Sequence, residues 1–542
     1  MGKAGSVNRY RLWYWARVLV QLCSLLLFLF LFIKTDYSGS DTIEYAVNIL
    51  FRIDPLLAFC TMLAARTFIA LMIPALILVV LSLFFGRFFC GWLCPMGGFL
   101  DFWRFCWRIK TSRKETRYPR LPRILLLFLL VCALFGLPFV GYFDPFSILV
   151  RGLVQAVYPA IRFISDSFFG YTYHNLPAAV NLVTEPVYAF MQATILPFEQ
   201  RFYELTLVSG LILAAVFFSE FFQSRFFCRN VCPLGALLGL FGRYGTMSLR
   251  GGDESCGKCT LCRTGCRMGA VDENRKILSS TCILCMDCML KCPKQIIHPQ
   301  LRAPLTTAAG DTMTNSREAS ISRRQFLVCL SAGAALPPLL AVRNHGGKGQ
   351  GTLIRPPGAL IEQEFLSSCV RCGECIQVCI TNGLQPAFFQ AGLEGAFTPY
   401  LLARSGYCEF NCTLCGQVCP TGAIEPLELD QKHTRKIGHA WFDKNICLPF
   451  AKNIPCIVCE EHCPTPDKAI KFNLVEVITG QGERITLKQP YVVDELCIGC
   501  GICETKCPLP GRAAIFVTNT GEDRDPENRL PGAETATIDG YS

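Results

Sequence analysis

The chain has 542 residues, of which 51% are hydrophobic and 33 are cysteine, and its formal net charge is +10 at pH 7. A short secreted disulfide scaffold is excluded by the length and the long apolar runs, and the cysteines fall in tight quartets, so metal ligation explains them better than disulfides do. The positive charge does not indicate a nucleic-acid partner, because many of the basic residues flank apolar segments, where membrane topology accounts for them.

Four apolar runs in the N-terminal segment 1–250 are long enough to cross a membrane. The N-terminus is basic, so we expect the first run to start on the cytoplasmic side. The loop after the second run is rich in arginine and lysine and is also expected inside, whereas residues 144–204 contain few basic residues and are expected as an outside loop. The runs lie at about 18–33, 68–85, 124–143 and 205–222.

An internal repeat runs through these helices. The pattern R-F-F-C-x3-C-P occupies residues 87–95 and recurs at 225–233. A proline disfavours helical geometry at the residue before it, so each cysteine pair is expected at a helix break. If the two copies meet, their four thiols converge. The thiols could then form a further metal site or a redox-active thiol pair near a quinone. The alternative is that they are helix-end cysteines with packing roles only. These thiols belong to Cys90, Cys94, Cys228 and Cys232.

Residues 251–300 form a small cysteine-dense segment, in which we expect a cytoplasmic ferredoxin domain with two clusters. Both of its quartets have the spacing C-x2-C-x2-C-x3-C, which is typical of bacterial [4Fe-4S] ferredoxins, where the fourth cysteine of each run binds the other cluster. Structural zinc sites, the alternative, use paired knuckles with wider separations. The predicted ligand sets are Cys256, Cys259, Cys262 and Cys292 for one cluster, and Cys282, Cys285, Cys288 and Cys266 for the other.

Residues 301–345 combine a polar linker with a predicted fifth helix. Arg323 and Arg324 are followed by Phe-Leu and an apolar run over 326–342, the pattern of a twin-arginine export signal. The alternative is a chance Arg-Arg beside an ordinary buried helix. No clean cleavage site follows, so we expect a retained helix that leaves residues 346–542 in the periplasm.

The C-terminal segment, 346–542, carries four more quartets and a loose tail after about residue 517. Two quartets are regular, and two contain lengthened loops without losing a ligand. Their spacing does not show which run supplies its fourth cysteine to the cluster of which other run. The candidate ligands are Cys369, Cys372, Cys375, Cys379, Cys408, Cys412, Cys415, Cys419, Cys447, Cys456, Cys459, Cys463, Cys497, Cys500, Cys503 and Cys507.

Other cofactor patterns are missing from the sequence. No C-x-x-C-H haem attachment motif occurs, and the six histidines lie outside the predicted spans. There is no dinucleotide fingerprint and no P-loop, so we predict no haem and find no flavin signal. Six [4Fe-4S] clusters are the expected cofactors.

With these motifs placed, the segment 1–300 resembles the NapH family of membrane ferredoxin-type proteins, and residues 320–515 resemble the NapG/MauM family of exported ferredoxin-type proteins. The resemblance departs from both families in joining them in one polypeptide. It implies a multidomain membrane protein of the bacterial inner membrane: a duplicated four-helix transmembrane bundle, a fifth helix, and α+β bacterial-ferredoxin-like domains on both sides.

The resemblance also implies a quinol dehydrogenase, which passes electrons from the membrane quinone pool to a periplasmic redox enzyme or cytochrome, as in nitrate reductase systems. Asp54 and Asp144, each followed by proline, are expected at the outer face, where they either accept quinol protons or, more simply, cap helices. Two alternatives remain: an electron-donating maturation factor for a periplasmic metalloenzyme, and a relay subunit of a larger redox complex.

Overall fold

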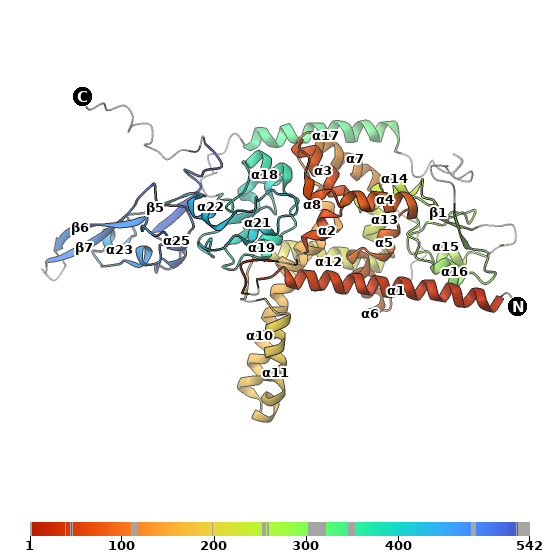
Figure 1. The fold of residues 1–542 in the computed structure, drawn as a ribbon, viewed down its shortest axis with the longest axis horizontal. Coiled ribbons are helices and arrows are strands. Elements are labelled where there is room, and N and C mark those ends of the chain that lie inside the picture. The colour runs from red at the N-terminus through yellow and green to blue at the C-terminus, as the bar shows by residue number, and fades with distance from the viewer. Residues whose placement is uncertain are drawn as a thin grey trace. The chain divides into compact units, whose positions relative to one another are not determined.

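The protein was examined as a computed structural model, which describes residues 3–37, 39–43, 45, 47–109, 118–197, 199–251, 256, 259–301, 321–344, 353–478, 484–526 and 528. The chain forms two compact units. Unit 1 comprises residues 1–34, 45–156 and 207–339, and unit 2 comprises 35–44, 157–206 and 340–542. Figure 1 labels their elements.

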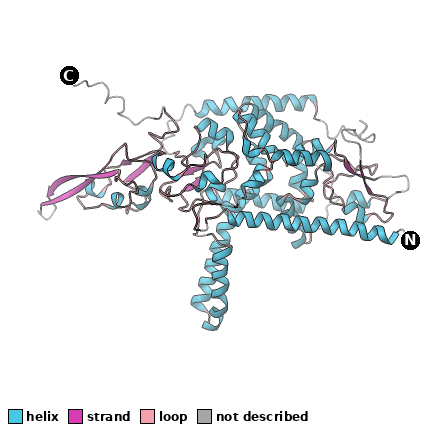
Figure 2. Cartoon of the chain, in the orientation of Figure 1, coloured by secondary structure: helices cyan, strands magenta, loops and turns pink. Residues whose placement is uncertain are grey.

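Unit 1 is mainly helical (Figure 2). Its helices in the segment 1–250 are α1 (Lys3–Lys34), α2 (Asn48–Arg52), α3 (Pro55–Ala65), η1 (Ala70–Met72), α4 (Ala75–Phe85), α5 (Phe88–Trp92), α6 (Pro95–Cys106), α7 (Leu121–Leu134), α8 (Val140–Phe143), α9 (Pro145–Gly152), the π-helical turn η2 (Leu153–Val157), α12 (Thr206–Phe222), α13 (Phe226–Asn230) and α14 (Pro233–Gly242).

Two helical stretches among the described residues are long and apolar enough to cross a membrane, namely Tyr10–Lys34 and Pro145–Asn175. The bent pair Ala70–Phe85 and Phe88–Cys106 adds a third if it is counted as one span. The other predicted runs are shorter helices here. The run at 124–143 is divided between α7 and α8, because Gly136 takes a left-handed φ of +87° just after α7 and Pro138 follows it.

The two copies of the repeat have the same order of elements: an apolar helix, a short helix and a third helix that begins with proline. In the first copy the chain bends by 95° between residues 70–85 and 88–106. Cys94 and Cys232 are the N-cap residues of α6 and α14, each with proline at the first helical position. The predicted helix break at each Cys-Pro is confirmed.

The predicted fifth helix forms as α17 (Arg323–Asn344). It packs against α7, where the Cys132 thiol donates to the Gly333 carbonyl at 3.8 Å. A Cβ at position 333 would lie 2.8 Å from the Val131 side chain, so glycine permits this close approach. Of the predicted linker, residues 301–320, all but residue 301 lies outside the described residues.

The cysteine-dense segment of unit 1 has the small α+β form that the sequence predicts. Strand β1 (Met247–Arg250) pairs antiparallel with β2 (His298–Leu301), and α15 (Leu261–Thr264) and α16 (Asp287–Lys291) lie between them in sequence. Buried side chains from these elements and the adjoining loops form one apolar core: Leu249, Leu284, Met286, Met289 and Ile297. This core holds the loops that carry the cysteines.

Unit 2 is built from small antiparallel pairs and short helices. Strand β3 (Leu384–Pro386) pairs with β4 (Pro399–Leu401), β5 (His439–Phe442) with β8 (Ile515–Thr518), and β6 (Ile470–Ile478) with β7 (Arg484–Val492). Its short helices are α18 (Glu362–Ser368), α19 (Glu374–Gln377), η6 (Phe389–Ala391), α20 (Gly392–Gly395), α21 (Leu414–Gln417), α22 (Leu429–Thr434), α23 (Leu448–Ala451), α24 (Val458–Glu461) and α25 (Ile502–Lys506).

Residues 144–204, expected as an outside loop, are largely helical. Helix α10 (Tyr158–Asn175) continues from η2, and α11 (Ala178–Thr194) follows it. His174 therefore lies inside a stretch that qualifies as a span, so the prediction that all six histidines lie outside spans is wrong at this position. A pair of histidine ligands within that stretch is still missing, because His174 is its one histidine.

Candidate functional site

The second cysteine run of unit 1 lies around a cavity together with one cysteine of the first run. The cavity is lined by the thiol-bearing residues Cys266, Cys282, Cys285 and Cys288 and by apolar side chains. The thiols of Cys282, Cys285 and Cys288 each interact electrostatically with that of Cys266. This is the exchange of the fourth ligand that the ferredoxin spacing predicts.

These residues fit a [4Fe-4S] cluster chemically. Burial raises the pKa of the Cys282 thiol to about 12 and that of Cys285 to about 11. In such surroundings a thiol loses its proton when a cation takes the proton's place, and an iron ion that binds the sulfur is such a cation. In the other predicted set, Cys262 interacts with Cys256 and Cys259.

Unit 2 contains the same exchange twice, a pairing that sequence reasoning left open. One cavity is lined by Cys379 together with Cys408, Cys412 and Cys415. Electrostatic contacts between thiols define all four sets. Set A is Cys369, Cys372, Cys375 and Cys419; set B is Cys408, Cys412, Cys415 and Cys379; set C is Cys497, Cys500, Cys503 and Cys463; set D is Cys447, Cys456, Cys459 and Cys507.

The four sets of unit 2 follow one another in a series. Sets A and B exchange a cysteine, as do sets C and D. Sets B and C meet directly, because the backbone N–H of Cys408 donates to the Cys500 carbonyl at 2.8 Å and the two thiols interact. The arrangement therefore places four potential one-electron carriers in the order A, B, C, D.

Within unit 2, the segment that leads toward α12 lies beside set B. Arg201 is 4% exposed, forms an ion pair with Asp36 at 2.6 Å and donates to the Gln377 carbonyl. Arg201 and Tyr203 both interact electrostatically with the Cys379 thiol. These two side chains thus connect the segment 157–206 to set B, the second set of the series.

The two C-x3-C-P copies meet in unit 1, and their four thiols converge. Cys94 interacts with Cys90 and Cys228, and Cys232 interacts with all three of the others. Cys90, Cys94 and Cys232 are buried and Cys228 is half-buried. No three of the described histidine, cysteine, aspartate or glutamate side chains anywhere in the protein lie close enough to hold a single metal ion.

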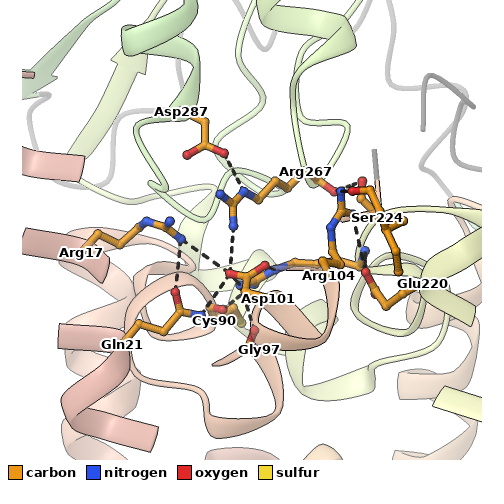
Figure 3. A network of polar contacts seen from close by, with 12 residues as sticks. Arg17, Gln21, Cys90, Gly97, Asp101, Arg104, Glu220, Ser224, Arg267 and Asp287 are labelled. Atoms are coloured by element: carbon orange, nitrogen blue, oxygen red, sulfur yellow. Dashed lines mark hydrogen bonds and ion pairs between the residues drawn. The ribbon is translucent and has the colours of Figure 1, made fainter. Parts of the chain in front are cut away.

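An ion-pair network connects these copies to the cysteine-dense segment (Figure 3). Asp101 on α6 accepts from Arg225 at 2.8 Å and pairs with Arg267 at 2.9 Å and with Arg17 at 3.6 Å. Arg267 also pairs with Asp287 at 2.6 Å. Asp287 lies between Cys285 and Cys288 in the sequence. The sequence predictions did not include this network, although Arg225, which opens the second R-F-F-C pattern, was a signal of it.

Asp54 and Asp144 cap helices, as the simpler interpretation expects. Asp54 accepts from the N–H of Leu56 at 2.7 Å, and Asp144 accepts from the N–H of Ser147 at 2.8 Å. The two side chains are 1% and 0% exposed and interact electrostatically, and one carboxyl oxygen of each is buried without a hydrogen-bond partner among the described residues.

Comparisons with known proteins agree with the iron–sulfur chemistry. A family model described as a 4Fe-4S binding domain matches residues 67–114 and 205–251, which are the two C-x3-C-P copies. The chain is 37% identical over 196 residues to the ferredoxin-type protein NapG of Escherichia coli, covering 35% of this chain and 82% of the relative. No solved structure matches.

Two further relatives show how far the likeness extends. The chain is 37% identical over 242 residues to the methylamine utilization ferredoxin-type protein MauM of Methylorubrum extorquens, covering 42% of this chain and 98% of the relative. It is 28% identical over 227 residues to an uncharacterized protein, MJ0750, of Methanocaldococcus jannaschii, covering 41% and 75%. The chain therefore belongs to the NapG/MauM family of ferredoxin-type iron–sulfur proteins.

Proposed function

We propose that this electron-transfer protein is a membrane-bound quinol dehydrogenase that passes electrons from the quinone pool to a periplasmic redox enzyme or cytochrome, such as a nitrate reductase system. The observation that carries the proposal is the series of cysteine sets A to D in unit 2, with set B beside the segment that leads toward the helices of unit 1. When bound, [4Fe-4S] clusters accept and release single electrons. Six clusters are proposed for the quartets of both units.

The membrane arrangement is part of the proposal. The helices of the segment 1–250 form a NapH-like duplicated bundle, and α17 crosses as a retained helix derived from a twin-arginine signal at Arg323 and Arg324. The N-terminus and residues 251–300 face the cytoplasm, and residues 346–542 face the periplasm. The helices Tyr10–Lys34 and Pro145–Asn175, which are long and apolar enough to span, support membrane association.

The residues of unit 1 supply what a quinol donor requires. Oxidation of one quinol to quinone releases two electrons and two protons. The buried pair Asp54 and Asp144 is a candidate proton acceptor, because one carboxyl oxygen of each has no hydrogen-bond partner among the described residues. Electrons leave one at a time, and [4Fe-4S] clusters would accept them if the cysteine sets of this unit hold such clusters.

The test is an anaerobic titration of the oxidised, purified full-length protein with a reduced quinol analogue, followed by iron–sulfur absorbance and EPR. We expect rapid reduction of a subset of clusters. We expect a Cys500→Ser variant to keep this reduction but to lose electron transfer to a periplasmic acceptor, since Cys500 belongs to set C, which links sets B and D. The Cys23→Ser variant is the control, because Cys23 is an exposed lone cysteine.

The alternatives predict other outcomes. If the clusters stay oxidised with quinol but accept electrons from dithionite, the independent dehydrogenase fails and a relay subunit takes its place. If the Cys500→Ser variant leaves the terminal enzyme without its own cofactors, the protein acts in maturation.

A further inference from the structure

The four converging cysteines of the repeat stand among buried positive charges. Arg225 is fully buried, donates to the Cys90 carbonyl at 2.7 Å, and interacts electrostatically with the Cys94 and Cys228 thiols. Its charge is balanced by Asp101. Arg87 opens the first copy as Arg225 opens the second, is 6% exposed, and interacts with the thiols of Cys228 and Cys282.

The two arginines are exchanged between the copies. A Cβ at Gly97 of the first copy would lie 3.3 Å from the guanidinium of Arg225, and a Cβ at Gly235 of the second would lie 2.3 Å from the guanidinium of Arg87. Each copy therefore places its arginine over the glycine that follows the other copy's Cys-Pro. The two copies form one site, to which each contributes two thiols and one cation.

The charge at this site is incomplete without an anion. Among the described residues, no carboxylate forms an ion pair with Arg87, and Arg123, another cation, interacts with it electrostatically. A buried cation without a partner is costly. When iron binds, it replaces the protons of the four thiols. The resulting thiolates supply negative charge beside Arg87, which lacks a carboxylate partner among the described residues.

The site also touches the loop of the Cys282 set. The Trp92 indole N–H donates to the Leu284 carbonyl at 3.0 Å, and a Cβ at Gly91 would lie 2.3 Å from the Ile283 carbonyl oxygen. Trp92 and Gly91 lie on α5 beside Cys90. A cofactor held by the four cysteines is therefore a direct neighbour of that set.

We propose that Cys90, Cys94, Cys228 and Cys232 jointly bind one additional [4Fe-4S] cluster, a seventh, with Arg87 and Arg225 as its counter-charges. One thiolate for each of four irons suits four thiols that converge but, among the described residues, do not meet at one ion. The family model for a 4Fe-4S binding domain matches these two copies. The proposal does not depend on quinol being the electron donor.

The first test counts iron in the wild-type protein. Full-length protein is purified anaerobically, and its iron, acid-labile sulfide and zinc are measured together with its mass under native conditions. We expect about 28 irons and about 28 sulfides per chain, since seven clusters hold four of each. A value of about 24, with or without one zinc per chain, overturns the proposal.

The second test uses the double variant Cys94→Ser/Cys232→Ser, with Cys132→Ser as a matched control. Cys132 is a buried cysteine of the same unit that contacts α17 and none of the four thiols. We expect the double variant to hold about 24 irons and the control to hold about 28. Unchanged iron in the double variant contradicts the proposal. If the double variant loses much more iron through misfolding, the wild-type count decides.

The third test examines Arg87 as a positioning charge. In Arg87→Gln, the reduction potential of one cluster should shift to more negative values, because a positive charge beside an anionic cluster favours its reduction. In Arg87→Lys, the potential should return toward that of the wild type. A redox titration followed by EPR measures both, and a potential that does not move in Arg87→Gln contradicts this role.

Discussion

Each unit contains one carboxylate that forms ion pairs with more than one arginine, and the two arrangements differ. In unit 1, Asp101 is 13% exposed and pairs with Arg17, Arg225 and Arg267. In unit 2, Glu362 is 33% exposed and pairs with Arg355 and Arg524. Both carboxylates join segments that are far apart in sequence.

The arginines differ in what else they contact. In unit 2, Arg524 also pairs with Glu522 at 2.6 Å, and Arg355 also donates to the Pro399 carbonyl at 2.7 Å. In unit 1, Arg225 has Asp101 as its one carboxylate among the ion pairs of the described residues, and its other acceptors are carbonyls. The stability of unit 1 therefore depends more heavily on a single carboxylate, because its buried arginines have fewer other carboxylates to balance their charge.

The largest effect should follow from Asp101→Asn. The change leaves the buried Arg17 and Arg225 without their carboxylate, so we expect unit 1 to lose about 3–5 kcal/mol or more of stability, the cost of breaking a buried ion pair from one side. Thermal unfolding and the iron content of the purified protein measure the loss. The matched control is Glu273→Gln, whose side chain is 80% exposed in its pair with Arg263. It should cost about 0–1 kcal/mol, and equal effects of the two changes would contradict the comparison.

A smaller effect is expected from Glu362→Gln, at about 3 kcal/mol, because both arginines keep other partners. Arg355 and Arg524 lower the pKa of Glu362 from 4.5 to about 2 against the opposing effect of burial. The stabilisation is therefore fully present above pH 4.5 and is lost as the pH falls toward 2. Unfolding of unit 2 measured across this range should lose that pH dependence in Glu362→Gln.

The control for Glu362 is Asp166→Asn. Asp166 is 34% exposed and pairs with Arg162 one helical turn away. Such a pair contributes about 0.3–0.5 kcal/mol. If the stability of unit 2 still depends on pH in Glu362→Gln, a group other than Glu362 is responsible for that dependence.

The smallest effect concerns Arg87, an arginine that forms no ion pair with a carboxylate among the described residues. In Gly235→Ala the new methyl group meets the Arg87 guanidinium, and we expect a loss of about 1–3 kcal/mol from overpacking. Gly98→Ala on α6 is the control, because its Cβ would make ordinary contacts of 3.7–3.8 Å. It should be neutral or stabilising by up to about 1 kcal/mol. Equal unfolding temperatures for both variants would show that Arg87 moves aside freely.

The sequence alone was informative about local features. Cysteine spacing predicted that Cys266 lies with the Cys282 run, and the structure places these cysteines around one cavity; their role as cluster ligands stays a prediction. Proline at positions 95 and 233 predicted the helix breaks at Cys94 and Cys232, since its ring restricts the residue before it. The resemblance to the NapG/MauM family followed from the same local motifs.

Only the tertiary structure decided which distant residues meet. The lengthened loops of the second and third outer quartets concealed the pairing of sets A to D, which depends on how those loops pack and not on their spacing. Asp101 and Arg267 carry no motif, yet folding brings them together, because buried charges must find partners. Residues 144–204 read as a loop from their few basic residues, but their apolar composition folds as helix, since charge bias reports topology and not backbone conformation.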